Sequence, residues 1–221
     1  MNRSSRPASS PARAAHAART ASHQIRIIGG TWKRTLLPVL DLDGLRPTPD
    51  RVRETLFNWL GQDLHGLRCL DLFAGSGALG LEAASRDAER VVMVERSPKA
   101  VRQLRANLER LHAQTVEVVE ADAFRLVAGL APASFDVIFL DPPFEGDGLA
   151  RILLHCLALL KPDGALYLEA GLPLERLVQN LPEDLPARGG TPFPSPAPWE
   201  VVRQGRAGAV HYHLLQRGNE E

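Results

Sequence analysis

Cys69-Leu70-Asp71-Leu72-Phe73-Ala74-Gly75-Ser76-Gly77-Ala78-Leu79-Gly80 is the stretch around which the rest of the chain can be organised. It begins as an apolar run of strand character that is interrupted by one acid, Asp71. The glycines that follow allow a tight turn and a close approach of the backbone to a ligand, and the next helix offers free amide groups. The stretch therefore predicts a buried strand, a ligand-binding loop and a helix.

Apolar and amphipathic segments alternate on the C-terminal side of this stretch. Strands are predicted at 68–73, 90–95, 115–120, 135–140 and 164–169, and helices near 77–86, 97–112, 122–129, 147–160 and 173–180. Such alternation is typical of an α/β fold with a Rossmann-like, doubly wound, mostly parallel sheet that has helices on both faces. A proline-rich loop is expected at 182–198, and the runs Trp199–Gln204 and Gly208–Gln216 are expected to form an antiparallel edge.

The N-terminal part of the chain has a different composition. Residues 1–23 contain no acid and no large apolar residue, which predicts a disordered basic tail, although an organelle transit peptide has a similar composition. Residues 24–47 are predicted to form a small β-hairpin extension and a linker, with the turn at Gly29-Gly30. The main domain is expected to span 48–221 and to begin with a helix, because Thr48-Pro49-Asp50 supplies a capping hydroxyl and a proline in the first turn.

Charge is unevenly distributed along the 221 residues, although the formal net charge is zero. Residues 1–60 carry ten Lys or Arg against four acids, a net charge of +6, and the remainder carries −6. A basic N-terminal part suggests a phosphate-bearing partner. The alternative is an ordinary basic segment that is exposed to solvent and binds no partner.

Other features point to a cytoplasmic protein without a metal site. Cys69 and Cys156 lie in apolar segments, as buried free thiols of a reducing compartment do. Cys and His residues show no metal-ligand spacing, and no apolar run is long enough for a membrane span.

Two kinds of cofactor fit the glycine loop. Gly75, Gly77 and Gly80 match the dinucleotide pattern G-x-G-x-x-G, and Glu95 follows about 20 residues later, so a nicotinamide or flavin oxidoreductase is one interpretation. The position of Asp71 inside the strand disfavours it, because dinucleotide-binding strands usually run apolar into the first glycine.

Three acids at the ends of successive strands support the other interpretation. Asp71 can bind an ammonium group, Glu95 both ribose hydroxyls and Asp122 an adenine amine, which together outline S-adenosylmethionine. Each acid alone is also typical of a helix cap. Phe73 and Ala123 flank these acids and complete, with Gly75 and Gly77, the predicted cofactor-binding set.

Asp141-Pro142-Pro143-Phe144 ends the apolar run 135–140. Two prolines cannot continue a sheet ladder, so the chain must leave the sheet in a stiff shape at the edge where α/β proteins bind ligands. The Asp141 carboxylate and the Pro142 carbonyl can accept the hydrogens of an exocyclic amine, while Phe144 stacks on the base. A strand that ends in a proline turn with an acidic cap is the alternative.

The chain resembles a known family at this point. Asp71–Gly77 is similar to motif I of class I S-adenosylmethionine-dependent methyltransferases, and Asp141–Phe144 to the amino-methyltransferase motif. Arg46–Leu60, together with Arg26-Ile27-Ile28-Gly29-Gly30, resembles RsmD-type 16S ribosomal RNA (guanine-N2)-methyltransferases. The resemblance implies a Rossmann-like sheet, S-adenosylmethionine as methyl donor, guanine N2 of 16S rRNA as acceptor, and action on a small ribosomal subunit or an assembly intermediate.

Phosphate contacts to the RNA are expected from basic residues of the hairpin and of the first helix: Arg26, Lys33, Arg34, Arg51 and Arg53. For Arg51 and Arg53, ion pairs that hold the helix to the domain are the alternative. An amino-methyltransferase of another nucleic acid or of a protein glutamine, and a non-catalytic RNA-binding assembly factor, also remain open.

Overall fold

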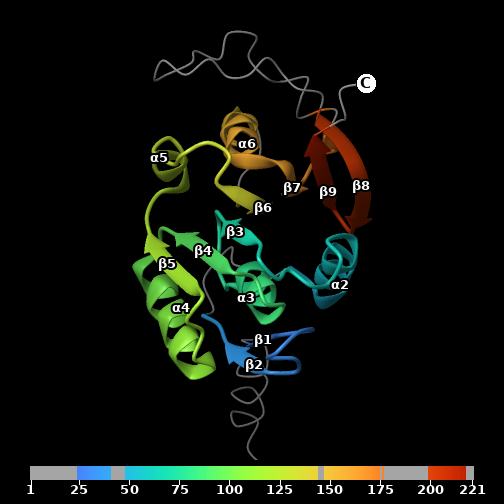
Figure 1. Cartoon of the computed structure of the whole chain (residues 1–221). Coiled ribbons are helices and arrows are strands. Elements are labelled where there is room, and N and C mark those ends of the chain that lie inside the picture. The colour runs from blue at the N-terminus through green and yellow to red at the C-terminus, as the bar shows by residue number, and fades with distance from the viewer. Residues whose placement is uncertain (1–23, 41–47, 144–146, 175, 177–198, 218–221) are drawn as a thin grey trace, which may run out of the picture.

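The computed structural model describes residues 24–40, 48–143, 147–174, 176 and 199–217. Within these ranges it contains a seven-stranded sheet in the order β5-β4-β3-β6-β7-β9-β8 and a separate two-stranded sheet (Figure 1). The strands of the large sheet are β3 (Arg68–Asp71), β4 (Arg90–Glu95), β5 (Val116–Glu120), β6 (Phe135–Leu140), β7 (Leu160–Ala170), β8 (Trp199–Ala207) and β9 (Val210–Arg217). β5, β4, β3, β6 and β7 are parallel neighbours, whereas β9 pairs antiparallel with both β7 and β8, which confirms the predicted fold class.

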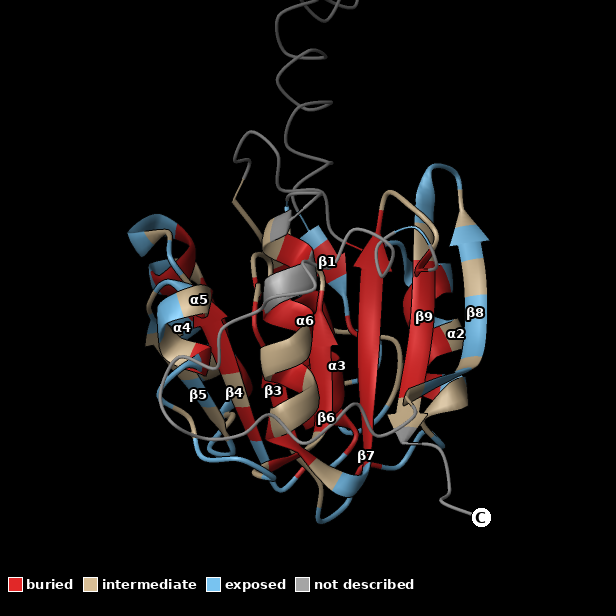
Figure 2. Ribbon diagram, turned by 90° about the horizontal axis from the view of Figure 1, so that it is seen from above, coloured by how far each residue is buried: buried red, intermediate tan, exposed pale blue. Residues whose placement is uncertain are grey.

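Helices cover both faces of this sheet (Figure 1). They are α2 (Asp50–Trp59), α3 (Ala78–Ser85), α4 (Pro98–Leu111), α5 (Ala123–Val127) and α6 (Asp147–Leu159). Alternate residues of each strand face opposite sides, so two apolar cores form. Cys69, Val137 and Phe139 pack with α2, α3 and the hairpin, while Leu70 and Ile138 pack with α5 and α6. The central strands are buried, and β8 at the edge is partly exposed (Figure 2).

Of the predicted helix at 173–180 the structure describes Pro173, which is not helical, and Leu174 and Arg176, which are helical. The tail 1–23, the linker residues 41–47 and the whole proline-rich loop 182–198 lie outside the described residues. In the part of the chain that the structure describes, no helix is both long and apolar enough to cross a membrane.

The hairpin differs from the prediction in its turn. β1 (Gln24–Arg26) pairs with β2 (Leu36–Pro38), so residues 27–35 join the strands in a loop that is longer than the predicted turn at Gly29-Gly30. The intervening backbone packs on α3 instead: the amides of Ile28 and Gly29 donate to Glu82 at 2.8 and 2.7 Å. Gly30 has φ +71°, and a Cβ there would lie 1.6 Å from the Ser85 carbonyl oxygen, so only glycine fits. Gly29-Gly30 thus lies in the loop that joins β1 to β2, where the Gly30 carbonyl accepts from the Lys33 amide at 3.2 Å, and it also docks this loop on α3.

Candidate active site

The glycine loop joins β3 to α3 and holds Asp71 at the end of the strand. Asp71 is 2 % exposed, and its Oδ2 accepts a hydrogen bond from the Gly80 amide at 2.9 Å. Burial raises the pKa of Asp71 to about 7, and the charge of Asp141 contributes, although the Gly80 amide opposes the shift. Gly77 has φ +81°, and a Cβ there would lie 2.6 Å from Leu104 of α4, which explains the glycine. A buried carboxyl at this position is suited to a cationic partner.

Glu95, at the end of β4, is tied to the same loop. Its Oε2 accepts from the Gly75 amide at 3.0 Å and its Oε1 from the Ser97 amide at 2.7 Å. Because β3 and β4 are parallel neighbours, their carboxyl ends meet at one edge of the sheet. The structure therefore brings Asp71, Gly75 and Glu95 together, as the sequence predicted.

Asp122 follows β5 and caps α5, since its Oδ1 accepts from the Arg125 amide at 3.1 Å. The helix-cap interpretation of this acid is thus correct, and the exposed side chain also stands at the edge where β3 and β4 end. Ala123 is buried, and the rings of Phe73 and Phe124 meet edge to face with centroids 6.4 Å apart. These groups form an apolar flank beside the acids.

Asp141 follows β6 directly and is half-buried, as is Pro142. The Thr48 Oγ1 donates to Asp141 Oδ2 at 3.4 Å, and no side-chain hydrogen bond caps α2, whose N-cap residue is Pro49. The predicted capping role of the Thr48 hydroxyl is therefore wrong, because that hydroxyl faces the sheet edge instead. Burial raises the pKa of Asp141 to about 6, against the lowering effect of the Thr48 hydrogen bond. Phe144 lies outside the described residues.

Three residues at this edge were missed by sequence reasoning: Thr48, Tyr167 and Glu169. The Tyr167 hydroxyl donates to Glu169 Oε1 at 2.8 Å, and both side chains are buried. Burial, followed by the charge of Asp141, raises the pKa of Glu169 to about 8. The sequence did contain a signal for Glu169. This acid ends the predicted strand 164–169, and the preceding predicted strand, 135–140, is followed by Asp141.

The basic residues divide into two groups. Arg26, Lys33, Arg34 and Arg51 are exposed. Arg53 is 1 % exposed and is fully engaged: it contacts Asp50 at 2.7 Å, Glu82 at 3.4 Å and the Arg26 carbonyl at 2.9 Å. The prediction that Arg53 contacts RNA phosphates is contradicted by this burial, and the ion-pair alternative is correct for it.

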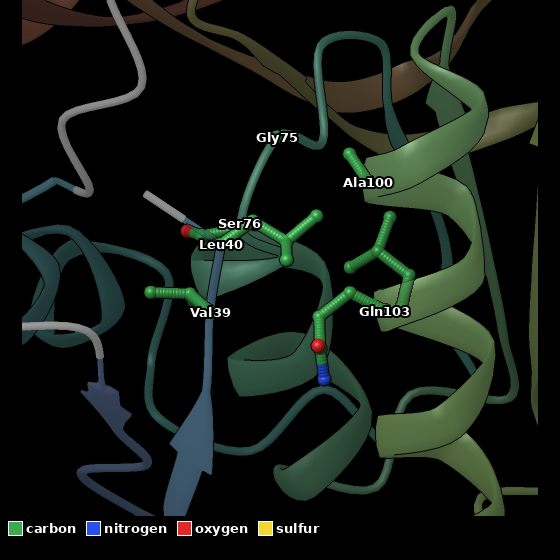
Figure 3. Close-up of a pocket in the computed structure, with 7 residues that line it drawn as sticks. Val39, Leu40, Gly75, Ser76, Ala100 and Gln103 are labelled. Atoms are coloured by element: carbon green, nitrogen blue, oxygen red, sulfur yellow. The ribbon is translucent and has the colours of Figure 1, made fainter. Parts of the chain in front are cut away.

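A small pocket lies beside the glycine loop (Figure 3). Gly75 and Ser76 form one wall, α4 forms another with Ala100, Gln103 and Leu104, and Val39–Leu40 close it. The pocket shares only Gly75 with the predicted cofactor-binding set. Among the residues that the structure describes, no group of His, Cys, Asp or Glu is arranged to hold a metal ion.

Comparison with known proteins identifies the family. A family model described as "Conserved hypothetical protein 95" matches residues 25–216. The chain is 43% identical over 196 residues to "Ribosomal RNA small subunit methyltransferase D" of Escherichia coli (strain K12), which covers 89% of this chain and 91% of that protein. The protein of the same description from Haemophilus influenzae is 38% identical over 202 residues, with 89% and 95% covered. The chain belongs to this family.

Solved structures agree with this membership. An Escherichia coli structure superposes with a TM-score of 0.70 at 36% identity, covering 89% of this chain and 99% of that one. A precorrin-6Y C5,15-methyltransferase from Geobacter metallireducens, with a TM-score of 0.58 and 21% identity, shares the fold alone. Membership of the methyltransferase family replaces the oxidoreductase interpretation of the glycine pattern.

Proposed function

We propose that this protein transfers a methyl group from S-adenosylmethionine to the exocyclic N2 amine of a guanine in small-subunit (16S) ribosomal RNA. The observation that carries the proposal is Asp141-Pro142 at the end of β6, beside the glycine loop, in a chain that matches the small-subunit rRNA methyltransferases D over 89% of its length. The protein would act in the cytoplasm, on a small ribosomal subunit or an assembly intermediate.

The residues at the ends of β3, β4 and β5 fit S-adenosylmethionine. Asp71 would hold the ammonium group of its amino-acid part, because a buried carboxyl gains most from a cationic partner. Glu95 would accept from the ribose hydroxyls and Asp122 from the adenine amine, with Phe73 and Ala123 against the ring. Gly75 and Gly77 leave room for close approach of the backbone. When bound, the cofactor supplies an electrophilic methyl group on a sulfonium.

Asp141 and Pro142 would act on the guanine amine. The nitrogen lone pair is delocalised into the ring, and two acceptors on its hydrogens favour the pyramidal geometry that releases it. Asp141 would accept one proton from this nitrogen when the nitrogen takes up the methyl group, and the Pro142 carbonyl would hold the other hydrogen. Positioning is the main catalytic contribution of such a site. Phe144 is proposed to stack on the base, which must be unpaired or flipped out of its stack.

RNA phosphates would contact the exposed cations Arg26, Lys33, Arg34 and Arg51. Their backbone position is fixed because the hairpin and α2 are both anchored on Glu82 of α3. Such contacts orient a nucleic acid on the protein and carry no base specificity of their own.

The function is tested with tritiated S-adenosylmethionine and small subunits that lack base methylation, beside naked rRNA, DNA and total protein. We expect label in N2-methylguanosine of small-subunit rRNA. Asp141→Ala should reduce transfer by about 10²-fold or more while cofactor affinity stays near the wild-type value. Asp163→Ala, an exposed acid at the start of β7, is the matched control and should be fully active. Label in DNA or protein, or equal loss of transfer and cofactor binding in Asp141→Ala, would contradict the proposal.

A further inference from the structure

The carboxyl ends of β6 and β7 place beside Asp141 two polar side chains, Tyr167 and Glu169, that have no role in the proposed methyl transfer so far. Strand register pairs Leu140 with Leu168, so Asp141 and Glu169 each stand one residue beyond a paired position on neighbouring parallel strands. Tyr167 is 0 % exposed, and Glu169 and Thr48 are each 6 % exposed. Buried polar groups are normally hydrogen-bonded, so the partners of each group can be followed one by one.

The hydrogen bonds connect these groups in a chain. Tyr167 donates to Glu169 Oε1 at 2.8 Å, and Thr48 lies 3.4 Å from Asp141 Oδ2. The Thr48 hydroxyl also lies close enough to Glu169 to lower the pKa of that carboxyl, although burial outweighs this effect. A hydroxyl has one proton and can donate to only one of two carboxyls. Both contacts are satisfied together if Thr48 donates to Asp141 and accepts from a protonated Glu169.

We propose that Glu169 is a positioning residue for Asp141: its carboxyl, oriented by Tyr167, holds a proton and donates to Thr48, and Thr48 in turn fixes Asp141 Oδ2 so that Oδ1 is directed at the substrate amine. The proposal rests on the proposed function, because it requires Asp141 to be the group that meets the amine. Thr48 belongs to the segment that leads into α2, so this segment completes the active site.

The electrostatics of the surroundings favour one charge on this pair of carboxyls. Two like charges in one buried site cannot both ionise easily, and the carboxyl with the higher pKa keeps its proton. That carboxyl is Glu169, because burial and the charge of Asp141 raise its pKa, whereas Asp141 accepts the Thr48 hydrogen bond, which lowers the Asp141 pKa. The charged and titratable groups that surround the pair are Asp71 on β3, Tyr167 on β7, Tyr212 opposite Glu169 on β9, and Arg53, which donates to the Thr48 carbonyl at 3.3 Å.

The first test compares Glu169→Gln with Glu169→Ala in the rRNA methylation assay. Glutamine keeps a donor for Thr48 and an acceptor for Tyr167 but does not titrate. We expect Glu169→Gln to keep kcat within about threefold, and Glu169→Ala to lose about 10- to 100-fold in kcat with unchanged cofactor affinity. Wild-type kcat should fall above pH about 8, where Glu169 ionises, and Glu169→Gln should lack this alkaline decline.

Thr48 provides an independent pair of variants. Thr48→Ser retains the hydroxyl and should keep wild-type kcat, whereas Thr48→Val should lose about as much as Glu169→Ala. Thermal unfolding and cofactor binding of each variant identify any that fail to fold. An inactive Glu169→Gln, a fully active Thr48→Val, or a wild-type rate without an alkaline decline would overturn the positioning role while leaving the proposed function in place. A folded wild-type protein that methylates no small subunit at any pH would overturn both.

Discussion

Asp71 has two opposing influences on its carboxyl, burial and a hydrogen bond from the Gly80 amide. Burial dominates and raises the pKa to about 7 from an ordinary value of 3.8. A raised pKa means that the folded state binds more protons than the unfolded state between these two values. The free energy of unfolding therefore falls as the pH rises from about 4 to about 7, and the decrease is complete above the folded-state pKa.

Asp71→Asn should remove this dependence, since asparagine does not titrate. We expect the stability of the wild type relative to Asp71→Asn to decrease by about 1 kcal/mol or more between pH 4 and pH 8, one pKa unit being worth about 1.4 kcal/mol. Urea unfolding at a series of pH values measures the difference, and Asp163→Asn serves as an exposed control. The same substitution should weaken S-adenosylmethionine binding by about 10- to 100-fold at pH 8, because it removes a charge-assisted hydrogen bond. If the free energy of unfolding depends on pH in the same way in the wild type and in Asp71→Asn, ionisation of Asp71 is not the cause.

The sequence predicted the positions of some residues at the sheet edge but not the partners of others. Asp71, Glu95 and Asp141 were predicted because each ends a strand whose apolar run is visible locally. Thr48 was assigned to a helix cap, since its actual partner, Asp141, is 93 residues away in the chain. Arg53 was misassigned for the same reason: its partner Glu82 lies on another helix, and no local pattern marks a buried ion pair.

The elements α3, α2 and the hairpin are held together by one buried acid, Glu82, which is 0 % exposed. It accepts from the Ile28 and Gly29 amides and pairs with Arg53 at 3.4 Å and Arg86 at 3.0 Å. Apolar periodicity in the sequence predicted the boundaries of most helices and strands. It could not predict the contacts of Glu82, because α3 is buried on all sides and has no polar stripe in which this acid would stand out.

Glu82→Ala should destabilise the protein by about 3–5 kcal/mol, because it removes the charge partner of the buried Arg86 and one of the two acids that pair with the buried Arg53. Urea unfolding measures the loss. Glu117→Ala, which removes the partner of Arg90 in an ion pair whose side chains are 52% and 53% exposed, is the control and should cost about 0–1 kcal/mol. Equal effects of the two substitutions would show that the buried junction has no special importance.

The whole molecule is neutral, but its hairpin and α2 present cations to solvent. Replacing Lys33 and Arg34 together by Ala should lower the salt dependence of RNA affinity, with the slope of log K against log salt reduced by about 0.7 for each phosphate that is no longer neutralised. Filter binding at several salt concentrations measures the slope. A matched double substitution of the exposed Arg203 and Arg206 on β8 should leave it unchanged. The assignment fails if the two double variants have the same slope.

The anchoring of the hairpin has a consequence for the variability of this protein. Glu82 and Ser85 hold the backbone amides of residues 28, 29, 31 and 32, and not their side chains. Gly29 and Gly30 are restricted, because a Cβ at either position would meet Arg86 or the Ser85 carbonyl, and Trp32 is restricted because it packs against the apolar core. The exposed positions Thr31 and Lys33 can therefore diversify, in evolution or in a randomised library, while the attachment of the hairpin to α3 is preserved.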